Sequence, residues 1–378
     1  MIRCKYRIHA SGLLQAEQTA RALAVEQTVE VPDSLISNEI EANIVGNIMS
    51  VRESEMTDPN VQPTFEAVVE FNPELAADQF PQLLNLVYGN TSINPNVKLI
   101  DCEFPDSFVA RFNGPRFGVE GLRDLLGVFD RPLVCTALKP RGRSNDHFAE
   151  IARHFALGGG DLIKDDHNLI SAQFDDFADR VRKCQSAVEK ASDRTGRRCL
   201  YLPYICAPTD QIRHHIEFVL QCGIAGIMVS PMLIGLDFVR ALAEEYPILL
   251  MSHPTLTGTM YVNPTNGFDP GLFIGTFMRL IGIDASIFTN FGGRFNLSRD
   301  DCLAIATHLQ RPLGKLAPVW PVPAGGMQFD RIEQMCRDYG HDTILLVGGA
   351  LLERSPSLMD STREFMDRAR ERFSERLT

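Results

Sequence analysis

The stretch GGGDLIKDDHNLI, residues 158–170, gathers a lysine, two aspartates, a histidine and an asparagine behind the apolar pair Leu162–Ile163. If that pair belongs to a strand, the two-residue period points Lys164 and Asp166 to the same side, and His167 follows at the tip. Carboxylates and an imidazole at one place are good ligands for a hard divalent cation such as Mg2+. From these residues alone, a metal site and a salt-bridge cluster at a strand end are equally good interpretations.

Two further chemically capable residues follow apolar runs. Lys139 lies in ALKPRGRS, residues 137–144, and Arg141 two positions later is a candidate binding cation. A partly desolvated lysine near other cations can have its pKa lowered enough to accept a proton, although a phosphate-holding or structural lysine fits the same pattern. His253 ends the run LLMSHP. A lone histidine there is more often a hydrogen-bonded core residue, so its candidacy depends on its position alone.

Two glycine pairs, Gly325–Gly326 and Gly348–Gly349, each end a late apolar run. Glycine lets backbone N–H groups approach an anion closely, so the pairs favour a phosphate site, with simple tight turns as the alternative. Arg294 lies in NFGGRFN, residues 290–296. This segment fits a mobile lid that carries one cation, or an ordinary surface loop.

The elements that must position these residues form a regular series. From about residue 130, short apolar runs that end in proline, glycine or polar residues alternate with stretches of helical periodicity. Eight such units predict a (β/α)8 barrel, with an open doubly wound sheet as the alternative. In a barrel, the carboxyl ends of all strands meet at one face, which would bring the candidate residues together. The runs are 132–140, 161–166, 199–208, 226–231, 248–254, 285–290, 315–326 and 343–349.

The first 115 residues have a different pattern. IRCKYRIHA and PTFEAVVEFNP alternate like half-buried strands, whereas LLQAEQTARALAVEQT and PELAADQFPQLLNLVYG have helical spacing. We therefore predict an α/β protein with a small N-terminal α+β domain, residues 1–118, and a (β/α)8 barrel domain, residues 119–378. The end of the chain, SPSLMDSTREFMDRARERF, is predicted to form a closing helix.

Composition restricts the class of protein. The 378 residues are 44% hydrophobic and carry a net charge of −11, which indicates a globular chain and argues against binding to nucleic acid or an anionic membrane. Nine cysteines without CxxC spacing favour neither a disulfide framework nor a zinc cluster. No apolar stretch approaches the roughly 20 residues of a membrane span, and the N-terminus lacks a signal-peptide pattern. A cytoplasmic location is expected.

The run GGGDLIKDDHN resembles the metal-binding strand of ribulose-bisphosphate carboxylase/oxygenase (RuBisCO) large subunits, whose pattern is GG-x-D-x-x-KDDEN. Other segments resemble the family in the same order and with similar spacing, so the resemblance covers almost the whole chain. These segments are YGN (88–90), FNGPRFGVEGLRDLLGVFDRPLVCTALKPRGRS (112–144), SHP (252–254), PVPAGG (321–326) and VGGALL (347–352).

The resemblance implies specific roles at the strand ends. Lys164 matches the lysine that family members carbamylate with CO2, which turns a cation into an anionic ligand of one Mg2+ ion. Asp166 matches a second ligand, and His167 stands where the third ligand is normally glutamate. Lys139 matches the lysine that handles protons around the enediolate, and His253 matches the histidine of strand five.

The resemblance also implies a homodimer with shared active sites. Asn90 matches the asparagine that reaches in from a neighbouring subunit's N-terminal domain, and Glu26 matches that domain's glutamate. Gly326, Gly348 and Gly349 match the backbone phosphate cradle.

Other family features are missing. Pro254 replaces the main arginine of the second phosphate site, and Thr257 stands where the family has another histidine. The lid pattern VGKLEG is replaced around GGRFNLS, so its lysine corresponds at best to Arg294. The threonine–tryptophan pair expected near VEVPDS is also missing.

This combination resembles the RuBisCO-like proteins called form IV, whose members are enolases and isomerases of methylthio-pentulose phosphates, or decarboxylases and transcarboxylases of oxo-acid phosphates. We therefore expect an Mg2+-dependent isomerase, enolase or decarboxylase (lyase) that forms an enolate on a singly phosphorylated ketose or oxo-acid, without productive CO2 fixation. A catalytically silent relative that binds a phosphorylated metabolite is one alternative. A residual ribulose-bisphosphate carboxylase is the other.

Overall fold

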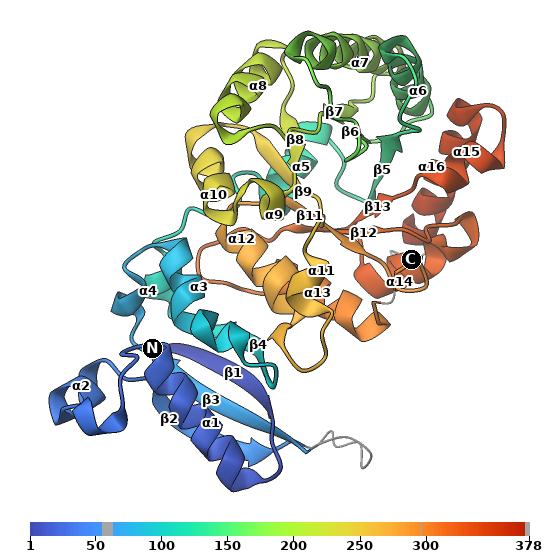
Figure 1. Cartoon of the computed structure of the whole chain (residues 1–378). Coiled ribbons are helices and arrows are strands. Elements are labelled where there is room, and N and C mark those ends of the chain that lie inside the picture. The colour runs from blue at the N-terminus through green and yellow to red at the C-terminus, as the bar shows by residue number, and fades with distance from the viewer. Residues whose placement is uncertain (55–62, 296, 375–378) are drawn as a thin grey trace. The chain divides into compact units, whose positions relative to one another are not determined.

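The computed structural model describes residues 1–54, 63–295 and 297–374. Contacts between residues group the chain into two compact units (Figure 1). The first unit comprises Met1–Asn113, Leu256–Leu280 and Pro312–Leu316, and the second comprises Gly114–Thr255, Ile281–Arg311 and Ala317–Thr378. The division into domains at residue 118 stays a prediction.

The second unit contains one sheet of eight parallel strands in the order β7-β6-β5-β13-β12-β11-β9-β8. The backbone of Met228 in β8 bonds to Pro203 and Ile205 beyond β7, both at 2.9 Å, which joins the two outer strands. The predicted (β/α)8 barrel is thereby confirmed, with one strand in each of the eight apolar runs. The strands are β5 (Leu133–Leu138), β6 (Leu162–Asp165), β7 (Leu200–Leu202), β8 (Gly226–Val229), β9 (Leu249–Ser252), β11 (Ala285–Thr289), β12 (Trp320–Ala324) and β13 (Ile344–Leu346).

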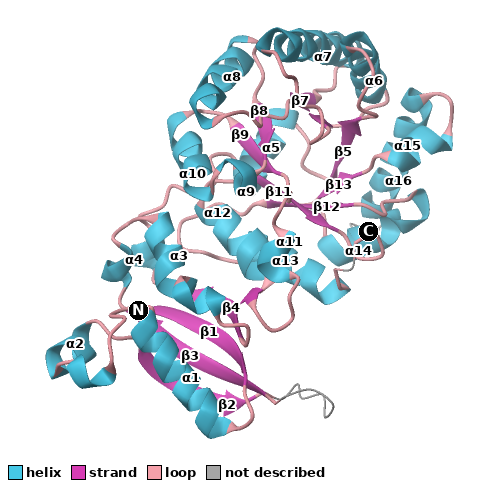
Figure 2. Cartoon of the chain, viewed as in Figure 1, coloured by secondary structure: helices cyan, strands magenta, loops and turns pink. Residues whose placement is uncertain are grey.

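Helices surround the barrel strands (Figure 2). In α6 the Ser144 hydroxyl accepts a hydrogen bond from the His147 N–H at 3.3 Å, which caps the first turn, and the buried Phe148 and Phe155 lie on one stripe. The helices of this unit range from the three-residue 3-10 helix η5 to the 22-residue α7. They are α5 (Gly118–Leu126), α6 (Asn145–Leu157), α7 (Phe174–Thr195), α8 (Thr209–Gln221), α9 (Pro231–Ile234), α10 (Leu236–Glu245), α13 (Arg299–Gln310), η5 (Phe329–Arg331), α14 (Ile332–Tyr339), α15 (Gly349–Arg354) and α16 (Leu358–Ser374).

The barrel interior is apolar and filled by side chains. Inward residues of the strands form one buried cluster that includes Leu162, Met251, Ile287 and Trp320, and α5 adds Leu122 to it. Because such an interior has no room for a ligand, the polar residues that follow the strands are confined to the mouth. The barrel therefore positions the site without containing it.

The first unit is built on a five-stranded sheet in the order β10-β4-β1-β3-β2. Buried positions alternate along β1 and β3, as the sequence predicted, and α1 contacts β2 and β3. Its elements are β1 (Ile2–His9), α1 (Leu13–Glu26), η1 (Asp33–Leu35), α2 (Asn38–Asn43), β2 (Asn47–Glu53), β3 (Thr64–Phe71), η2 (Pro73–Ala76), α3 (Phe80–Tyr88), η3 (Asn90–Ile93), β4 (Val97–Glu103), α4 (Asp106–Val109), α11 (Gly258–Tyr261), β10 (Gly267–Phe268), the π-helix η4 (Gly271–Phe277) and α12 (Met278–Leu280).

The strand β10 of this sheet comes from the segment between β9 and β11 of the barrel. Gly267 and Phe268 pair in parallel with Lys98 and Leu99 of β4. The Lys98 ammonium donates to the carbonyls of Tyr261 at 3.0 Å and Asn263.

Among the described residues, no helix combines the length and apolar character needed to cross a membrane.

Candidate active site

The register of β5 and β6 brings the two predicted lysines and Asp166 together. Leu138 pairs with Asp165 in parallel, so Lys139 and Asp166 follow their strands at the same level. The Lys139 Nζ atom lies 3.1 Å from Asp166 Oδ2, and the Lys164 Nζ atom donates to the Asp165 carbonyl at 3.1 Å. Lys164 and Asp166 are buried, whereas the Lys139 side chain is 43% exposed. Lys139 is therefore the amine of this group that a ligand can reach most easily.

His167 and His253 meet across the mouth. Their rings stack with centroids 4.2 Å apart and an interplanar angle of 17°. His167 Nδ1 lies 3.5 Å from Asp166 Oδ1, and His253 Nδ1 lies 2.7 Å from the Thr255 hydroxyl oxygen. Thr255 fixes the orientation of the His253 ring, and it was missed although it follows His253 by only two positions. The structure places His253 beside His167, one of the predicted metal ligands.

The electrostatics of the site follow from burial among cations. Burial lowers the pKa of the Lys164 ammonium, and the charge of Lys139 acts in the same direction. Burial together with the Lys164 charge lowers the pKa of His253 to about 2, so this imidazole is neutral. For Asp166, burial alone would raise the pKa, but the Asn168 N–H and Lys139 outweigh it and the pKa is lowered. Asp166 is thus an ionised carboxylate.

Asp165 points away from these residues and supports them. Its carboxylate accepts hydrogen bonds from the Tyr201 hydroxyl at 2.7 Å and from Arg180 Nε at 3.2 Å. Arg180 also donates to the Ser171 hydroxyl at 2.8 Å and to the Leu169 carbonyl at 3.2 Å. These bonds fix the chain on both sides of Asp166 and His167. Sequence reasoning missed Arg180 and Tyr201, because neither residue stands in a motif.

The two glycine pairs follow adjacent strands, β12 and β13, which pair at Ala324 and Leu346. The next strand in the sheet is β5, and its Thr136 hydroxyl donates to the Val347 carbonyl at 2.7 Å. Gly325 and Gly326 have φ angles of 90° and 65°, which only glycine adopts without strain. The predicted phosphate loops and the lysine cluster therefore lie at the ends of four consecutive strands, β12, β13, β5 and β6.

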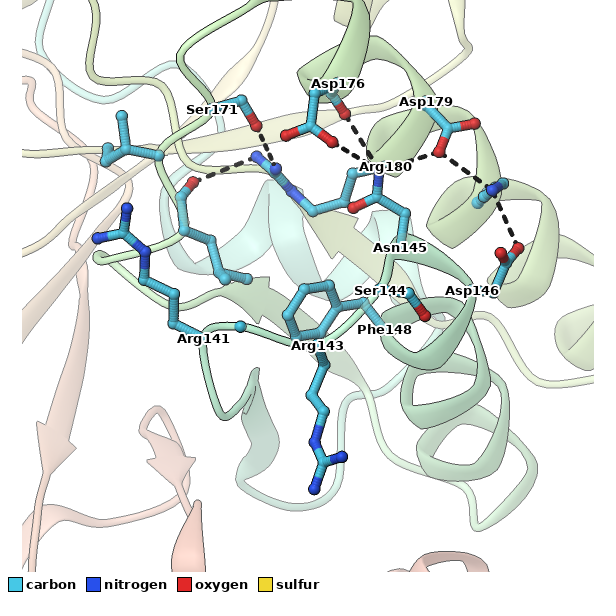
Figure 3. Close-up of a pocket in the computed structure, with 14 residues that line it drawn as sticks. Arg141, Arg143, Ser144, Asn145, Asp146, Phe148, Ser171, Asp176, Asp179 and Arg180 are labelled. Atoms are coloured by element: carbon cyan, nitrogen blue, oxygen red, sulfur yellow. Dashed lines mark hydrogen bonds and ion pairs between the residues drawn. The ribbon is translucent and has the colours of Figure 1, made fainter.

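The two arginines proposed as binding cations lie in loops that follow different strands, β5 and β11. Arg294 is exposed in the loop that follows β11. Arg141 lines a cavity of about 430 Å3 between the loops after β5 and β6, together with Arg143, Asn145 and Arg180. In Figure 3, Arg180 reaches Ser171, whereas the side chain of Arg143 extends away from it. The residues that line this cavity do not include the lysines or histidines of the mouth.

Glu26 and Asn90 are neighbours in the first unit. The Asn90 amide donates to Glu26 Oε1 at 2.9 Å, and both side chains are exposed. The buried Gln27 accepts a hydrogen bond from the Thr91 N–H at 3.0 Å and donates to the Asn85 carbonyl at 2.8 Å. This network fixes the end of α1 against η3. The two residues are therefore presented together on a rigid support.

Whether the side chains of Asp166 and His167 can hold a metal ion depends on Lys164. Among the residues whose positions are described, no group of three His, Cys, Asp or Glu side chains is placed to hold a metal ion. Asp166 and His167 supply two donors, and the third would have to come from Lys164, whose protonated amine is not a ligand. A buried lysine with a lowered pKa has more neutral amine to react with CO2. The donor set fits a divalent ion once Lys164 is carbamylated.

Comparison with known proteins identifies the family. The catalytic domain of the ribulose bisphosphate carboxylase large chain matches residues 118–354. The 5-methylthioribulose-1-phosphate isomerase of Rhodospirillum rubrum is 38% identical over 367 residues, which cover 97% of this chain and 95% of that protein. The chain therefore belongs to the RuBisCO large-chain family, as its motifs predicted.

Other relatives place it among the RuBisCO-like proteins of that family. The crystal structure of a RuBisCO-like protein from Rhodopseudomonas palustris is 35% identical, covers 97% of both chains and gives a TM-score of 0.85. A 2,3-diketo-5-methylthiopentyl-1-phosphate enolase from Bacillus velezensis is 30% identical over 340 residues, which cover 89% of this chain and 83% of the enolase. Relatives of this chain thus have the isomerase and enolase names that the sequence analysis anticipated.

Proposed function

We propose that this protein is a RuBisCO-like enzyme that forms an enolate next to a carbonyl on a singly phosphorylated ketose or oxo-acid and does not fix CO2. The observation that carries the proposal is that the lysine cluster and the glycine pairs follow neighbouring strands of the barrel. Lys139, Lys164 and Asp166 end β5 and β6, and the glycine pairs end the neighbouring β12 and β13. A phosphate held by the glycines would place the adjacent carbons of the same molecule beside the lysines.

Proton transfer is assigned to Lys139. Its Nζ atom is accessible and is held 3.1 Å from Asp166, so the amine has a fixed position from which to accept or return a proton. The neutral His253 ring, fixed by Thr255, can donate or accept one hydrogen bond at its free nitrogen. Isomerisation, enolisation and decarboxylation can all proceed from the same enolate.

The residues proposed to hold Mg2+ are Asp166, His167 and carbamylated Lys164. When bound, the ion supplies polarisation of the substrate carbonyl and stabilises negative charge on its oxygen. His167 replaces the carboxylate of the resembled family pattern, so the site has one negative charge fewer. Imidazole also binds softer divalent ions, which predicts that Mn2+ or Co2+ can replace Mg2+ more readily than in an all-oxygen site.

Phosphate binding is assigned to the backbone of Gly325, Gly326, Gly348 and Gly349. Within the described part of the chain, none of their N–H groups donates to a backbone carbonyl outside helices and strands. Arg294 and Arg141 remain proposed as additional cations around the substrate. With Pro254 in place of the family arginine, one phosphate is supported and a second is not.

Deuterium exchange tests the proposed chemistry directly. The purified protein, incubated with Mg2+ and bicarbonate in D2O, should incorporate deuterium next to the carbonyl of 5-methylthioribulose 1-phosphate or a related phosphorylated ketose, detected by mass spectrometry. Binding of these compounds without exchange would instead favour the catalytically silent relative. Carboxylation of ribulose bisphosphate is expected to be undetectable, and its detection would contradict the exclusion of CO2 fixation.

We further propose a homodimer in which Glu26 and Asn90 of one copy complete the site of the other. Their exposed, hydrogen-bonded side chains on a rigid support favour this role. Analytical ultracentrifugation should give twice the mass of the 42.2 kDa chain. An active monomer would contradict the shared site. The cytoplasm remains the proposed location.

A further inference from the structure

We propose that Arg331 is a positioning residue of the phosphate site. It joins the loop after β11 to the glycine loop after β12, and it brings a positive charge to that place. The inference rests on the proposed phosphate role of Gly325 and Gly326. Arg331 ends η5, five residues after Gly326, and stands in no motif of the sequence.

The guanidinium of Arg331 holds one carbonyl from each loop. Nη1 donates to the Gly326 carbonyl at 3.2 Å, and Nη2 donates to the Phe291 carbonyl at 3.1 Å. The same group lies over the Phe291 ring, 5.1 Å from its centroid. One planar, multiply donating group therefore connects two segments that are 35 residues apart in sequence, 291 to 326.

The two loops also touch through their backbones. A Cβ atom on Gly326 would lie 3.0 Å from the Gly293 Cα atom and 3.1 Å from the Gly292 carbonyl oxygen. A Cβ atom on Gly293 would lie 3.3 Å from the carbonyl of Gly325. Glycine on both sides makes this approach possible, and Arg331 fastens it. The position of the glycine loop is thus set by its contact with the loop after β11.

This arrangement leaves hydrogen-bond donors for an anion. In a trans peptide the N–H and C=O groups point in opposite directions, so fixing the Gly326 carbonyl toward Arg331 turns the Met327 N–H away from it. In the described segments, the N–H groups of Gly325, Gly326 and Met327 have no backbone acceptor outside the strands. Three consecutive N–H groups in this state are available to donate to an anion that approaches the loop.

The charge of Arg331 is not neutralised by its neighbours. Both of its hydrogen-bond acceptors are carbonyls, and no carboxylate of the described residues forms an ion pair with it. A phosphate beside the loop would therefore meet a full positive charge.

Substitution of Arg331 tests the inference, with inorganic phosphate as the probe. In Arg331→Met the side chain keeps its apolar stem but loses the charge and both hydrogen bonds. The Kd for phosphate, measured by calorimetry, should rise about tenfold or more, because the glycine loop loses its attachment to the loop after β11 and the site loses a positive charge. In the deuterium-exchange assay KM should rise similarly, while kcat changes less than about threefold. Arg337→Met, in the following helix α14 and with a 62% exposed side chain, is the matched control and should behave like the unaltered protein.

Arg331→Lys separates charge from geometry. A single ammonium cannot donate to both carbonyls in the fork geometry of a guanidinium, so the Kd should lie between those of the unaltered protein and Arg331→Met. An unchanged Kd in a folded Arg331→Lys or Arg331→Met protein would overturn the inference while leaving the proposed function intact. Phosphate binding that weakens in Arg331→Met, in a protein that exchanges no deuterium, would support the inference and refute the proposed function.

Discussion

Two buried charges at opposite ends of the barrel, Asp161 and Lys164, differ in the number of their partners. At the amino ends of the strands, Arg131 and Asp161 form a buried pair with two contacts of 2.7 Å, and Asp161 also accepts a hydrogen bond from the Val134 N–H at 2.8 Å. At the carboxyl ends, the buried Lys164 donates to a single backbone carbonyl. A buried charge with all its bonding positions used stabilises the backbone around it. A buried charge with few partners still has hydrogen-bonding positions available for a ligand.

Asp284 continues this contrast at the amino end of β11. Its carboxylate accepts hydrogen bonds from the backbone N–H groups of Phe117 at 2.7 Å, Gly118 at 2.9 Å and Leu250 at 2.9 Å. Three segments of the chain are thereby joined by one side chain. Substitutions at this end should change stability, and substitutions at the mouth should change chemistry.

Lys164→Met is expected to have the largest effect. The variant removes the amine that would be carbamylated and with it the third metal donor, so deuterium exchange should fall at least about 10³-fold. The variant should fold normally, because an apolar chain of similar length fills a buried position. Lys190→Met, at an exposed position of α7, provides the control and should keep full exchange. Exchange within a few-fold of the unaltered protein would show that Lys164 is not needed for the chemistry.

Arg131→Met should have the opposite effect, lowering stability while leaving deuterium exchange nearly unchanged. The substitution leaves Asp161 charged and buried without its partner, which should lower the free energy of unfolding by about 3–5 kcal/mol. Chemical denaturation measures this loss, while exchange per folded molecule should stay within about twofold. Adding Asp161→Asn to this variant should recover part of the stability. Lost exchange in a folded Arg131→Met protein would show that the two ends of the barrel are not separate in function.

Asp284 should make the free energy of unfolding depend on pH. Burial raises its pKa to about 6 despite the three N–H hydrogen bonds. The unfolded chain therefore loses this proton at lower pH than the folded chain, so the folded state loses stability as pH rises from about 4 to about 6. The change should be about 3 kcal/mol at about 1.4 kcal/mol per pKa unit. Subtracting the unfolding free energies of Asp284→Asn at each pH isolates this contribution, and a flat difference would contradict it.

Gly349→Ala should have the smallest effect. Gly349 is the first residue of α15, and the nearest atom to an added Cβ would be Glu353 Oε1 at an ordinary 3.8 Å. Alanine should therefore leave stability unchanged or raise it by up to about 1 kcal/mol. If phosphate approaches this backbone, the added methyl group should raise the Kd for phosphate about threefold to tenfold. Unchanged phosphate affinity would remove Gly349 from the proposed cradle.

Much of the fold could be predicted because its strands are short apolar runs that end in polar or glycine residues. The boundaries were less predictable, as β12 shows. The run 315–326 was expected as one strand, but β12 spans Trp320–Ala324 and contains Pro321 and Pro323, which cannot donate hydrogen bonds. The Trp320 N–H donates to the Asp284 carbonyl at 3.0 Å, so the prolines occupy the alternate positions. Nothing in the local sequence indicates which neighbouring strand supplies that acceptor.

The candidate site also contains residues that could be predicted from the sequence and residues that could not. Lys139, Lys164 and Asp166 could be predicted, because the two lysines directly follow apolar residues and Asp166 follows Lys164 by two positions, so the strand period gives the two residues the same direction. Arg180 and Arg331 could not, since their partners are backbone and side-chain atoms of other segments that only the folded chain brings near. The strands β2 and β4 were also missed: β2 has no buried position that would give an apolar pattern, and β4 pairs with β1 and with the distant β10.

The pairing of β10 with β4 has a consequence for the order of folding during synthesis. The ribosome completes β4 at residue 103, but the strand that pairs with it in parallel ends at residue 268, after five of the eight barrel strands have been made. The outer edge of the N-terminal sheet therefore waits for that strand, and the carbonyls of Tyr261 and Asn263 that receive the Lys98 ammonium arrive equally late. A nascent chain released before this point carries an open sheet edge, which favours association with other chains.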